Sequence, residues 1–227
     1  LGVSMAPKDF SVGVRIEHPR KIIDHIQLGN FAEDTNLGSA RYRLSHHDTN
    51  TNRGTYSFCM CPGGYVLSSG TEDDGIVVNG MSNYARNSKW SNSALVVSVK
   101  ANKDFSTDLN TLAGLDFQRS IEKKAHLFSK EMASGKELPA QNLKDFLEQK
   151  DYPKNLSKTS SPSGLFPLSL DKVLPPFVIS HLRNSFIEFE RSLKGFCFKD
   201  ALLIAPETRT SSPLTISRGK EDLESLS

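Results

Sequence analysis

The chain has 227 residues, of which 37% are hydrophobic, and its 28 basic and 26 acidic side chains leave a formal net charge of +2. A chain of this length can bury a core without a metal or a disulfide to hold it together. The two signs of charge are mixed along the chain, which argues against a nucleic acid or a membrane surface as the main partner. Three cysteines without scaffold spacing favour a reducing compartment. No apolar run approaches the ~20 residues that cross a bilayer.

The first hundred residues are predicted to form short strands. Val12, Val14 and Ile16 alternate with other residues over positions 10–17, so they share one face of a strand. Residues 21–28 have the apolar spacing of a short helix, which a glycine ends. Further strands, separated by turn residues, are expected at residues 40–44, 56–61, 65–67, 76–78 and 94–99.

The middle of the chain is predicted to be helical and the end to return to strand. Helices are expected at residues 117–128, 141–149 and 175–193, a polar loop or linker at 157–164, and strands at 201–205 and 214–217. This order, without βαβ alternation, predicts an α+β fold with an antiparallel or mixed sheet, or an open barrel. A helical layer is then inserted between early and late strands. We expect one structural unit with a β-rich part (1–100), a helical part (101–195) and returning strands (196–227).

The chain contains no familiar motif for holding a phosphate or activating a nucleophile. A dinucleotide site needs a strand, a glycine-rich turn and a helix N-terminus, and neither G-x-G-x-x-G nor a P-loop is present. The nucleophile motif G-x-S-x-G is also absent. His46-His47-Asp48 precedes a polar turn, and we interpret it as part of an exposed loop.

Cys59-Met60-Cys61 is the most conspicuous triplet. On a regular strand the two sulfurs would point to the same face. A structural zinc site needs four ligands, and the histidines and Cys197 offer no matching pair, so no metal is expected. Two interpretations stay open: a pair of small buried residues beside a tight turn, or a redox or ligand-lining role.

Two segments place charges at positions where burial is expected. Arg15, Glu17 and His18 fall within or beside the first predicted strand, and Glu207 and Arg209 follow an apolar run near the end of the chain. Such groups are costly to bury unpaired. The two segments therefore either satisfy one another or line a polar cleft.

Six segments, taken together and in order, resemble a family of FAD-dependent oxidoreductases, the NAD(FAD)-utilising dehydrogenases of bacteria and plastids. They are residues 14–19, 56–64, 78–82, 92–97, 114–119 and 207–213. The resemblance implies that a glycine-rich flavin loop lies upstream of this chain and a closing glycine-rich segment downstream. The chain would then be the region between the two parts of the FAD-binding domain, inactive alone, covering the flavin and shaping the substrate pocket.

The same resemblance implies that Arg15 and Arg209 steer an anionic substrate or offset negative charge on reduced flavin, while the redox chemistry is the cofactor's own. It fixes no catalytic residue. The residues interpreted as facing substrate or flavin are Arg15, Glu17, His18, Cys59, Cys61, Asn79, Glu207 and Arg209. The expected partners are the rest of the FAD-binding polypeptide and a small-molecule substrate, without nucleic acid or membrane. The alternative is a non-catalytic module that binds a protein or an RNA. The expected location is the cytoplasm, or the plastid stroma in a plant.

The first testable prediction is that this chain alone binds FAD, NAD and NADP no better than weakly, because it lacks a glycine-rich phosphate loop. Isothermal titration of the isolated chain with each nucleotide should give no tight stoichiometric binding. Tight binding of one FAD per chain would contradict the prediction.

Overall fold

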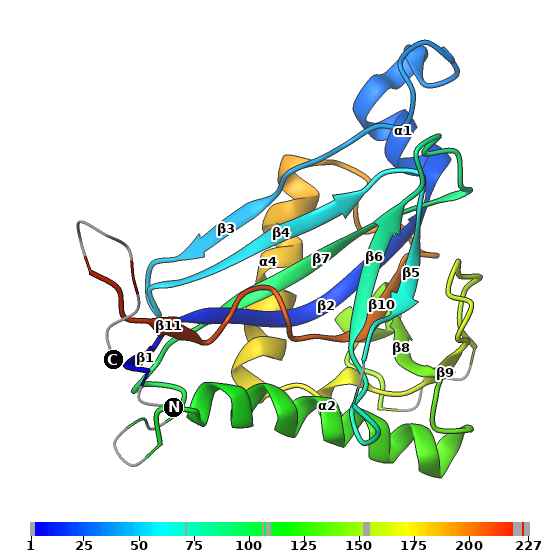
Figure 1. The fold of residues 1–227 in the computed structure, drawn as a ribbon. Coiled ribbons are helices and arrows are strands. Elements are labelled where there is room, and N and C mark those ends of the chain that lie inside the picture. Colours follow the sequence, from blue (N-terminus) through cyan, green and yellow to red (C-terminus); the bar gives the residue numbers. More distant parts are fainter. Residues whose placement is uncertain are drawn as a thin grey trace.

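The computed structural model describes residues 3–70, 72–105, 107, 110–151, 155–219 and 224. At its centre is a seven-stranded sheet in the order β3-β4-β7-β2-β10-β8-β9 (Figure 1). Its strands are β2 (Phe10–Pro19), β3 (Ser45–Asp48), β4 (Arg53–Cys61), β7 (Trp90–Val99), β8 (Leu138–Asn142), β9 (Leu165–Pro167) and β10 (Leu202–Glu207). Neighbouring strands are antiparallel except β8 and β9, which are parallel. The predicted α+β class with a mixed sheet is confirmed.

Two small sheets and the helices complete the described part of the chain. The hairpin of β5 (Gly64–Ser68) and β6 (Val78–Ser82) is one small sheet, and the ribbon of β1 (Met5–Pro7) and β11 (Leu214–Ile216) is the other. The helices are α1 (Arg20–Leu28), α2 (Ala113–Met132), α3 (Leu143–Leu147) and α4 (Pro176–Ser192), with 3-10 turns η1 (Gly29–Phe31) and η2 (Leu170–Lys172). None of these helices is long and apolar enough to cross a membrane.

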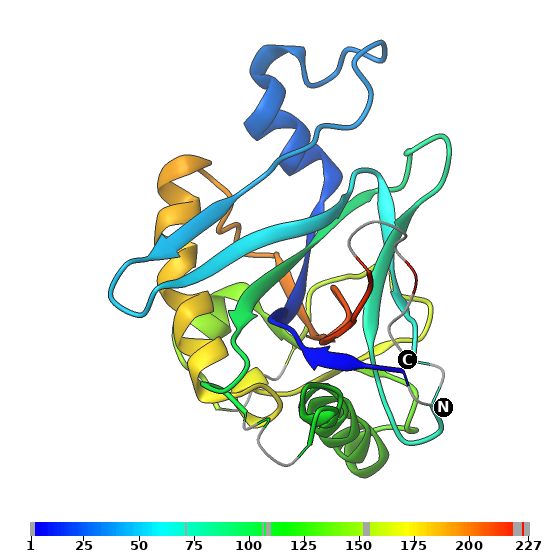
Figure 2. The same ribbon diagram turned by 60° about the vertical axis from the view of Figure 1, so that its left-hand side comes forward.

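Strand β2 is buried almost throughout because both faces of the sheet are covered at its position. Helix α4 lies behind the sheet and the β5–β6 hairpin lies in front of it (Figures 1 and 2). Side chains alternate along a strand, so Val12, Val14 and Ile16 belong to the face that α4 covers. Arg15 and Glu17 belong to the opposite face, under the hairpin. The predicted division of this strand into an apolar and a charged face is therefore present.

Helix α4 begins as predicted, directly after Pro175, whose neighbour Pro176 occupies the first helical turn. Val178, Leu182 and Phe186 recur on one side and are at most 1% exposed. Each fully buried side chain of this size contributes about 1.5–3 kcal/mol of hydrophobic stabilisation. Helix α4 thereby covers the apolar face of β2 and leaves the other face free for polar groups.

The end of the chain joins the sheet that the beginning of the chain starts. Strand β10 pairs with β2 on one side and with β8 on the other. The segment after β10 crosses in front of β2 to reach β11 (Figure 1), and the hydroxyl of Thr210 donates to the carbonyl of Ser11 at 2.9 Å on the way.

The middle segment is less uniformly helical than predicted. Residues 141–149 are not one helix, because strand β8 runs to Asn142 and only residues 143–147 are helical. Pro139 lies within β8, and because proline is depleted in strands, the sequence of this segment does not predict a strand. The pairing of β8 with β10 and β9, together with the complete burial of Leu138 and Ala140, decides its conformation.

Three local predictions also need correction. The strand predicted at residues 40–44 is wrong: these residues alternate between buried and exposed, but the ladder starts only at Ser45. His46-His47-Asp48, predicted to lie in a loop, belongs to strand β3. Val78 begins β6, so the strand predicted at residues 76–78 lies mostly after that range. Residues 157–164 are irregular as expected, yet Ser160 is hydrogen-bonded to the amide of Val66, which fixes this segment against the hairpin.

Candidate functional site

Arg15 is a fully buried guanidinium whose five N–H hydrogens all have acceptors. Its Nε donates to Glu207 Oε2 at 2.9 Å and its Nη2 to Glu207 Oε1 at 3.0 Å. The remaining hydrogens go to Asn92 Oδ1 at 2.9 Å, to the carbonyl of Cys59 at 3.2 Å and to Asn79 Oδ1 at 3.3 Å. Because an arginine has five such donors, its hydrogen-bonding capacity is complete. We name Arg15, Glu207, Asn79, Asn92 and the Cys59 carbonyl the Arg15 cluster.

Strands from distant parts of the chain position this cluster. Arg15 lies on β2, Glu207 at the end of β10, Asn92 on β7 and Asn79 on β6. Gly80 lets β6 lie directly on the guanidinium, because a Cβ there would stand 2.4 Å from Arg15 Nη1 and 2.2 Å from Asn92 Oδ1. The cluster is thus sealed between the sheet and the hairpin.

Burial and pairing have opposite effects on the two charges. Burial disfavours the cation, yet the carboxylate of Glu207 holds the pKa of Arg15 above its usual value. Burial raises the pKa of Glu207, and Arg15 opposes this rise. A two-pronged arginine–carboxylate contact is the geometry that best offsets such desolvation. Of the two alternatives left by the sequence, mutual satisfaction therefore applies to Arg15 and Glu207, and an open polar cleft does not.

Glu17 shares the face of Arg15 but has a separate set of partners. The backbone amide of Ser160 donates to its Oε1 and Oε2 at 3.3 and 3.1 Å, and the Ser160 hydroxyl also contacts it. Burial raises the pKa of Glu17, and the hydrogen bonds from Ser160 and Thr159 only partly offset this rise. Glu17 therefore fastens residues 159 and 160 to the sheet.

His18 lies on the opposite face of β2 and takes no part in the cluster. Its Nε2 is 2.7 Å from the carbonyl of Phe196, beside the end of α4. Burial lowers the pKa of His18 to about 4, against the effect of that carbonyl. The ring is therefore neutral near pH 7, with its proton on Nε2, because a carbonyl can only accept.

A regular strand was predicted for Cys59 and Cys61, and the structure differs from it. The register of β4 against β7 shifts between Phe58 and Cys61, which is a β-bulge. Cys59 has a positive φ of 46° and is exposed, while Cys61 is buried. The bulge turns the Cys59 carbonyl toward Arg15.

Thr208 and Arg209 leave β10 and bind α2. The Thr208 hydroxyl donates to Glu122 Oε1 at 2.5 Å, and Gln118 Nε2 donates to the Thr208 carbonyl at 2.8 Å. Arg209 donates two hydrogen bonds to the same carboxylate, from Nη2 to Oε2 at 2.8 Å and from Nε to Oε1 at 3.1 Å. Glu122, which is 1% exposed, thus holds an arginine that remains 40% exposed.

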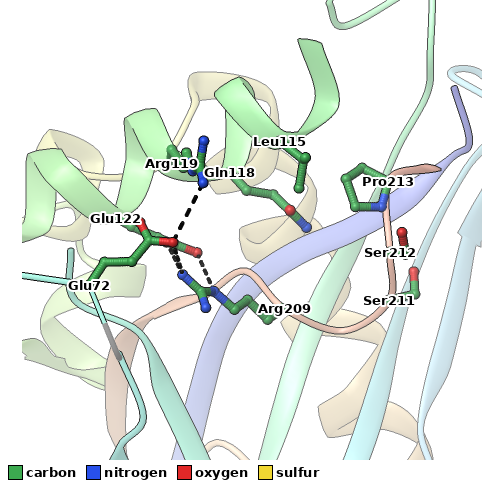
Figure 3. Close-up of a pocket in the computed structure, with 9 residues that line it drawn as sticks. All are labelled: Glu72, Leu115, Gln118, Arg119, Glu122, Arg209, Ser211, Ser212 and Pro213. Carbon is green, nitrogen blue, oxygen red and sulfur yellow. Dashed lines mark hydrogen bonds and ion pairs between the residues drawn. The ribbon is translucent and has the colours of Figure 1, made fainter. Parts of the chain in front are cut away.

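A cavity of about 350 Å³ opens beside this ion pair (Figure 3). Helix α2 forms one wall and the segment after β10 forms the other, with Glu72 at the rim. The residues that line the cavity are Glu72, Leu115, Gln118, Arg119, Glu122, Arg209, Ser211, Ser212 and Pro213. Arg119 and Arg209 both lie near Glu72, at 3.7 and 3.5 Å. We name this space the α2 cavity.

The residues that the sequence predicts to face substrate or flavin therefore lie in several separate places. Arg15, Asn79 and Glu207 meet in one cluster together with the backbone of Cys59, and Cys61 is opposite Asn92 on the same face. Glu17 lies apart on that face, Arg209 lines the α2 cavity, and His18 lies on the other face. The functional role of these residues stays a prediction.

Gln118 and Glu122 are the side chains that sequence reasoning missed. Glu122 lies off the apolar stripe of Phe117, Ile121, Ala125 and Phe128, which predicts exposure, yet it is 1% exposed. Gln118 lies on the side of Ile121 and Ala125 and is 5% exposed. Their partners Thr208 and Arg209 are more than eighty positions away in the sequence. The only sequence signal was the run of polar residues after β10, which needs a partner if it is buried.

Neither the described glycine pair nor the start of α2 has the arrangement of a phosphate-binding loop. The pair Gly63-Gly64 leads into strand β5 and not into a helix. The start of α2 is filled by protein, because a Cβ at Gly114 would stand 2.7 Å from the Cβ of Pro213. Among the described residues, no group of three or more histidine, cysteine, aspartate or glutamate side chains could hold a metal ion.

Comparison with known proteins assigns the family. The model of the family described as "FAD-dependent protein, C-terminal domain-like" matches residues 9–210. The chain belongs to this family and is a flavoprotein-related domain. It is also 39% identical over 226 residues to a Clostridium beijerinckii protein that bears the name "Uncharacterized protein". The match covers 99% of this chain and 41% of that protein, so the chain spans about two fifths of the relative's length.

The Arg15 cluster generates the second prediction. Replacing Arg15 by methionine leaves the Glu207 carboxylate buried without a counter-charge, so the free energy of unfolding should fall by about 3–5 kcal/mol. The double variant Arg15→Met with Glu207→Gln should recover a large part of this loss. Urea denaturation measures both. The control Arg191→Met removes an exposed arginine that pairs with Glu188 and should cost ~1 kcal/mol or less. Equal losses in Arg15→Met and the control would contradict the prediction.

Glu17 generates the third prediction, which concerns pH. Because its folded-state pKa lies above the usual value of 4.5, the folded protein binds this proton more tightly than the unfolded chain. The stability contributed by the protonated form is fully present below pH 4.5 and is lost as pH rises through the folded-state pKa. Glu17→Gln should therefore gain stability relative to the wild type as pH rises from about 4 to about 7. Denaturation curves across this range test it, with exposed Glu131→Gln as the control; parallel pH profiles of wild type and Glu17→Gln would refute it.

Proposed function

We propose that this chain is the substrate-side domain of a FAD-dependent oxidoreductase and that the α2 cavity is the part of it that faces the flavin and the substrate. Membership of the FAD-dependent C-terminal domain-like family supports a flavoprotein context. The oxidoreductase activity, the substrate and the electron acceptor belong to the whole protein and are part of the proposal. The sequence contains neither G-x-G-x-x-G nor a P-loop, so in this proposal the flavin would be held mainly by other residues of the polypeptide.

The observation that carries the proposal is the fixed guanidinium of Arg209 at the wall of the α2 cavity. Two hydrogen bonds to buried Glu122 hold it, and Glu122 is itself held by Thr208. A partly exposed arginine with its position fixed in advance can bind an anion or stabilise developing negative charge without reorganising. Gln118 on α2 and the serines at 211 and 212 on the wall of Arg209 add neutral polar groups to the cavity. Such a surface suits an anionic substrate or the negative charge of a reduced flavin.

The position of the cavity supports the same proposal. Pro213 lines the cavity, and the next residue begins β11, which pairs with β1. Strands β1 and β11 bring residues 5–7 and 214–216 side by side. A cofactor-binding domain joined to either strand would therefore be attached beside the α2 cavity.

The role of this domain would then be to bind and orient, while the flavin supplies the transfer of hydride or electrons. The α2 cavity would exclude part of the solvent from the reacting atoms, which strengthens every electrostatic contact within it. The buried Arg15 cluster would not touch the substrate, because Arg15 is completely covered. It would act by fixing Glu207, and with it the two residues that follow.

The fourth prediction tests the proposed flavin-facing role of Arg209 in the natural protein, with its cofactor bound. The protein should show the visible absorption bands of oxidised flavin. Arg209→Gln removes a positive charge from the cavity, so the midpoint potential of the flavin should become more negative and the visible spectrum should shift. Arg209→Lys keeps the charge and should change the potential less, although it loses the two-pronged contact with Glu122.

A matched control is Arg191→Gln, which removes an exposed arginine from the end of α4. It should leave spectrum and potential unchanged. Protein without flavin would refute the proposed function as a whole. A flavin whose spectrum and potential respond equally to the Arg209 and Arg191 variants would refute the assignment of the α2 cavity.

A further inference from the structure

Glu72 places a carboxylate between two arginines at the rim of the α2 cavity. Its Oε1 is 3.7 Å from Arg119 Nη2 and 3.5 Å from Arg209 Nη2. Arg119 belongs to helix α2 and Arg209 to the segment after β10, so the two guanidiniums approach the same oxygen from the two walls of the cavity (Figure 3). One carboxylate oxygen thus lies at the point where both positive charges converge.

The contacts of Glu72 with these arginines are loose. Charge-assisted hydrogen bonds measure about 2.7–2.9 Å, and the contact between Arg209 and Glu122, at 2.8 Å, falls in that range. The two contacts of Glu72 are longer, and all three side chains are partly exposed to solvent. Ion pairs between such exposed groups contribute little to stability. Glu72 is therefore attracted to the arginines without being firmly bound by them.

Both arginines retain donors that no described residue uses. Arg209 donates from Nε and Nη2 to Glu122, and no described residue accepts a hydrogen bond from its Nη1. Arg119 has Glu72 as its only described ion-pair partner, at a distance too long for a hydrogen bond. Because a guanidinium carries five N–H hydrogens, the rim can donate several well-formed hydrogen bonds to an anion that replaces the Glu72 carboxylate.

The balance of charge at the cavity favours a ligand with a single negative charge. Four charged side chains line the cavity: Arg119, Arg209, Glu72 and Glu122. Buried Glu122 offsets one positive charge, and Glu72 offsets the other. When the Glu72 side chain turns out into solvent, one positive charge at the rim is left over, and a monoanion restores the balance. A dianion such as phosphate would add an excess negative charge close to Glu122, and like charges repel.

The backbone that carries Glu72 is held against α2 independently of its side chain. The amide of Ile76 donates to the carbonyl of Glu122 at 3.2 Å, and Lys123 Nζ is 2.8 Å from Asp74 Oδ2. A ligand can therefore displace the Glu72 carboxylate through the rotation of one side chain, without releasing residues 74 and 76 from α2.

The other end of the cavity is apolar. Leu115 lies one helical turn before Arg119 on α2, and Pro213 packs against Gly114 at the start of the same helix. Figure 3 shows Pro213 and the Glu72 carboxylate on opposite sides of the view. A cavity of about 350 Å³ with one charged and one apolar end suits a small amphipathic ligand.

We propose that the α2 cavity binds a small monocarboxylate with a short apolar body. Its carboxylate displaces Glu72 and bridges Arg119 and Arg209, and its apolar body packs against Leu115 and Pro213. Glu72 is then an internal competitor, which occupies the rim while the ligand is absent. The inference rests on the proposed function only in taking this ligand as the substrate of the flavoprotein, because the binding itself needs no flavin.

The test is a titration of the natural protein, with its cofactor bound, with acetate, propionate and butyrate, followed by saturation-transfer difference NMR of the ligand. Binding should be saturable. The dissociation constant should fall at least twofold with each added methylene, and about fourfold where the methylene is fully buried. Inorganic phosphate, titrated in the same way, should bind more weakly than butyrate.

Two variants test the competing carboxylate and the bridging cation. Glu72→Gln removes the competitor and should lower the dissociation constant of butyrate about two- to fivefold, the range that an exposed ion pair accounts for. Arg119→Gln removes charge-assisted hydrogen bonds to the ligand and should raise it about tenfold or more. The matched controls Glu188→Gln and Arg191→Gln each remove one partner of an exposed ion pair on α4 and should leave it unchanged.

Three results would overturn this inference while leaving the proposed function standing. They are a wild type without saturable binding of any of the three carboxylates, dissociation constants that stay the same in Glu72→Gln and Arg119→Gln, and phosphate that binds as tightly as butyrate. The visible spectrum of the flavin separates the two proposals. Saturable binding that follows the expected variants but leaves this spectrum unchanged would support the carboxylate site and contradict the placement of the flavin beside the α2 cavity.

Discussion

The burial of one guanidinium is the constraint on which the rest of this structure depends. Arg15 lies in the central strand of the sheet with no exposed surface, and an unpaired charge at such a position would cost several kcal/mol. Its five hydrogens therefore demand acceptors from several parts of the chain. Strand β10 supplies Glu207, strands β6 and β7 supply two asparagine oxygens, and the bulge of β4 supplies a backbone carbonyl. The hairpin can approach closely because Gly80 has no side chain.

The same constraint places the polar groups at the surface. Because Arg15 fixes Glu207, the following residues leave the sheet at a defined point, and Thr208 and Arg209 reach Glu122 on α2. The α2 cavity is thus bordered by residues whose positions derive from a buried ion pair one strand away. On the other side, the carbonyl that Arg15 draws inward belongs to Cys59, and the kink that turns it also leaves the Cys59 side chain exposed. Both the α2 cavity and the bulge of β4 are neighbours of one electrostatic centre.

In a protein of the family to which the chain belongs, different domains can have different roles. The described residues form a sheet whose apolar face is filled by α4 and whose polar face carries the fixed charges of Arg15, Glu207 and Glu17. In the proposed function the α2 cavity faces the flavin and the substrate, whereas Pro213 packs against Gly114 at the start of α2. In a FAD-dependent protein such a domain would contribute specificity and electrostatics, and the nucleotide would be held elsewhere. Fold and family alone assign no reaction, which has to be established from the site itself.

The sequence by itself determined the strand β2, the helices α1, α2 and α4, and the α+β order, because alternate and 3.6-residue apolar spacing, prolines and glycines act locally. It also showed that the charges at 15 and 207 needed partners, because burying an unpaired charge is costly. Only the tertiary structure decided which partners they have. Strand β8 forms despite Pro139 because β9 and β10 lie beside it, and Glu122 is buried because Arg209 arrives from a distance of 87 positions. Such outcomes depend on contacts between residues far apart in the chain, and no local pattern of residues records those contacts.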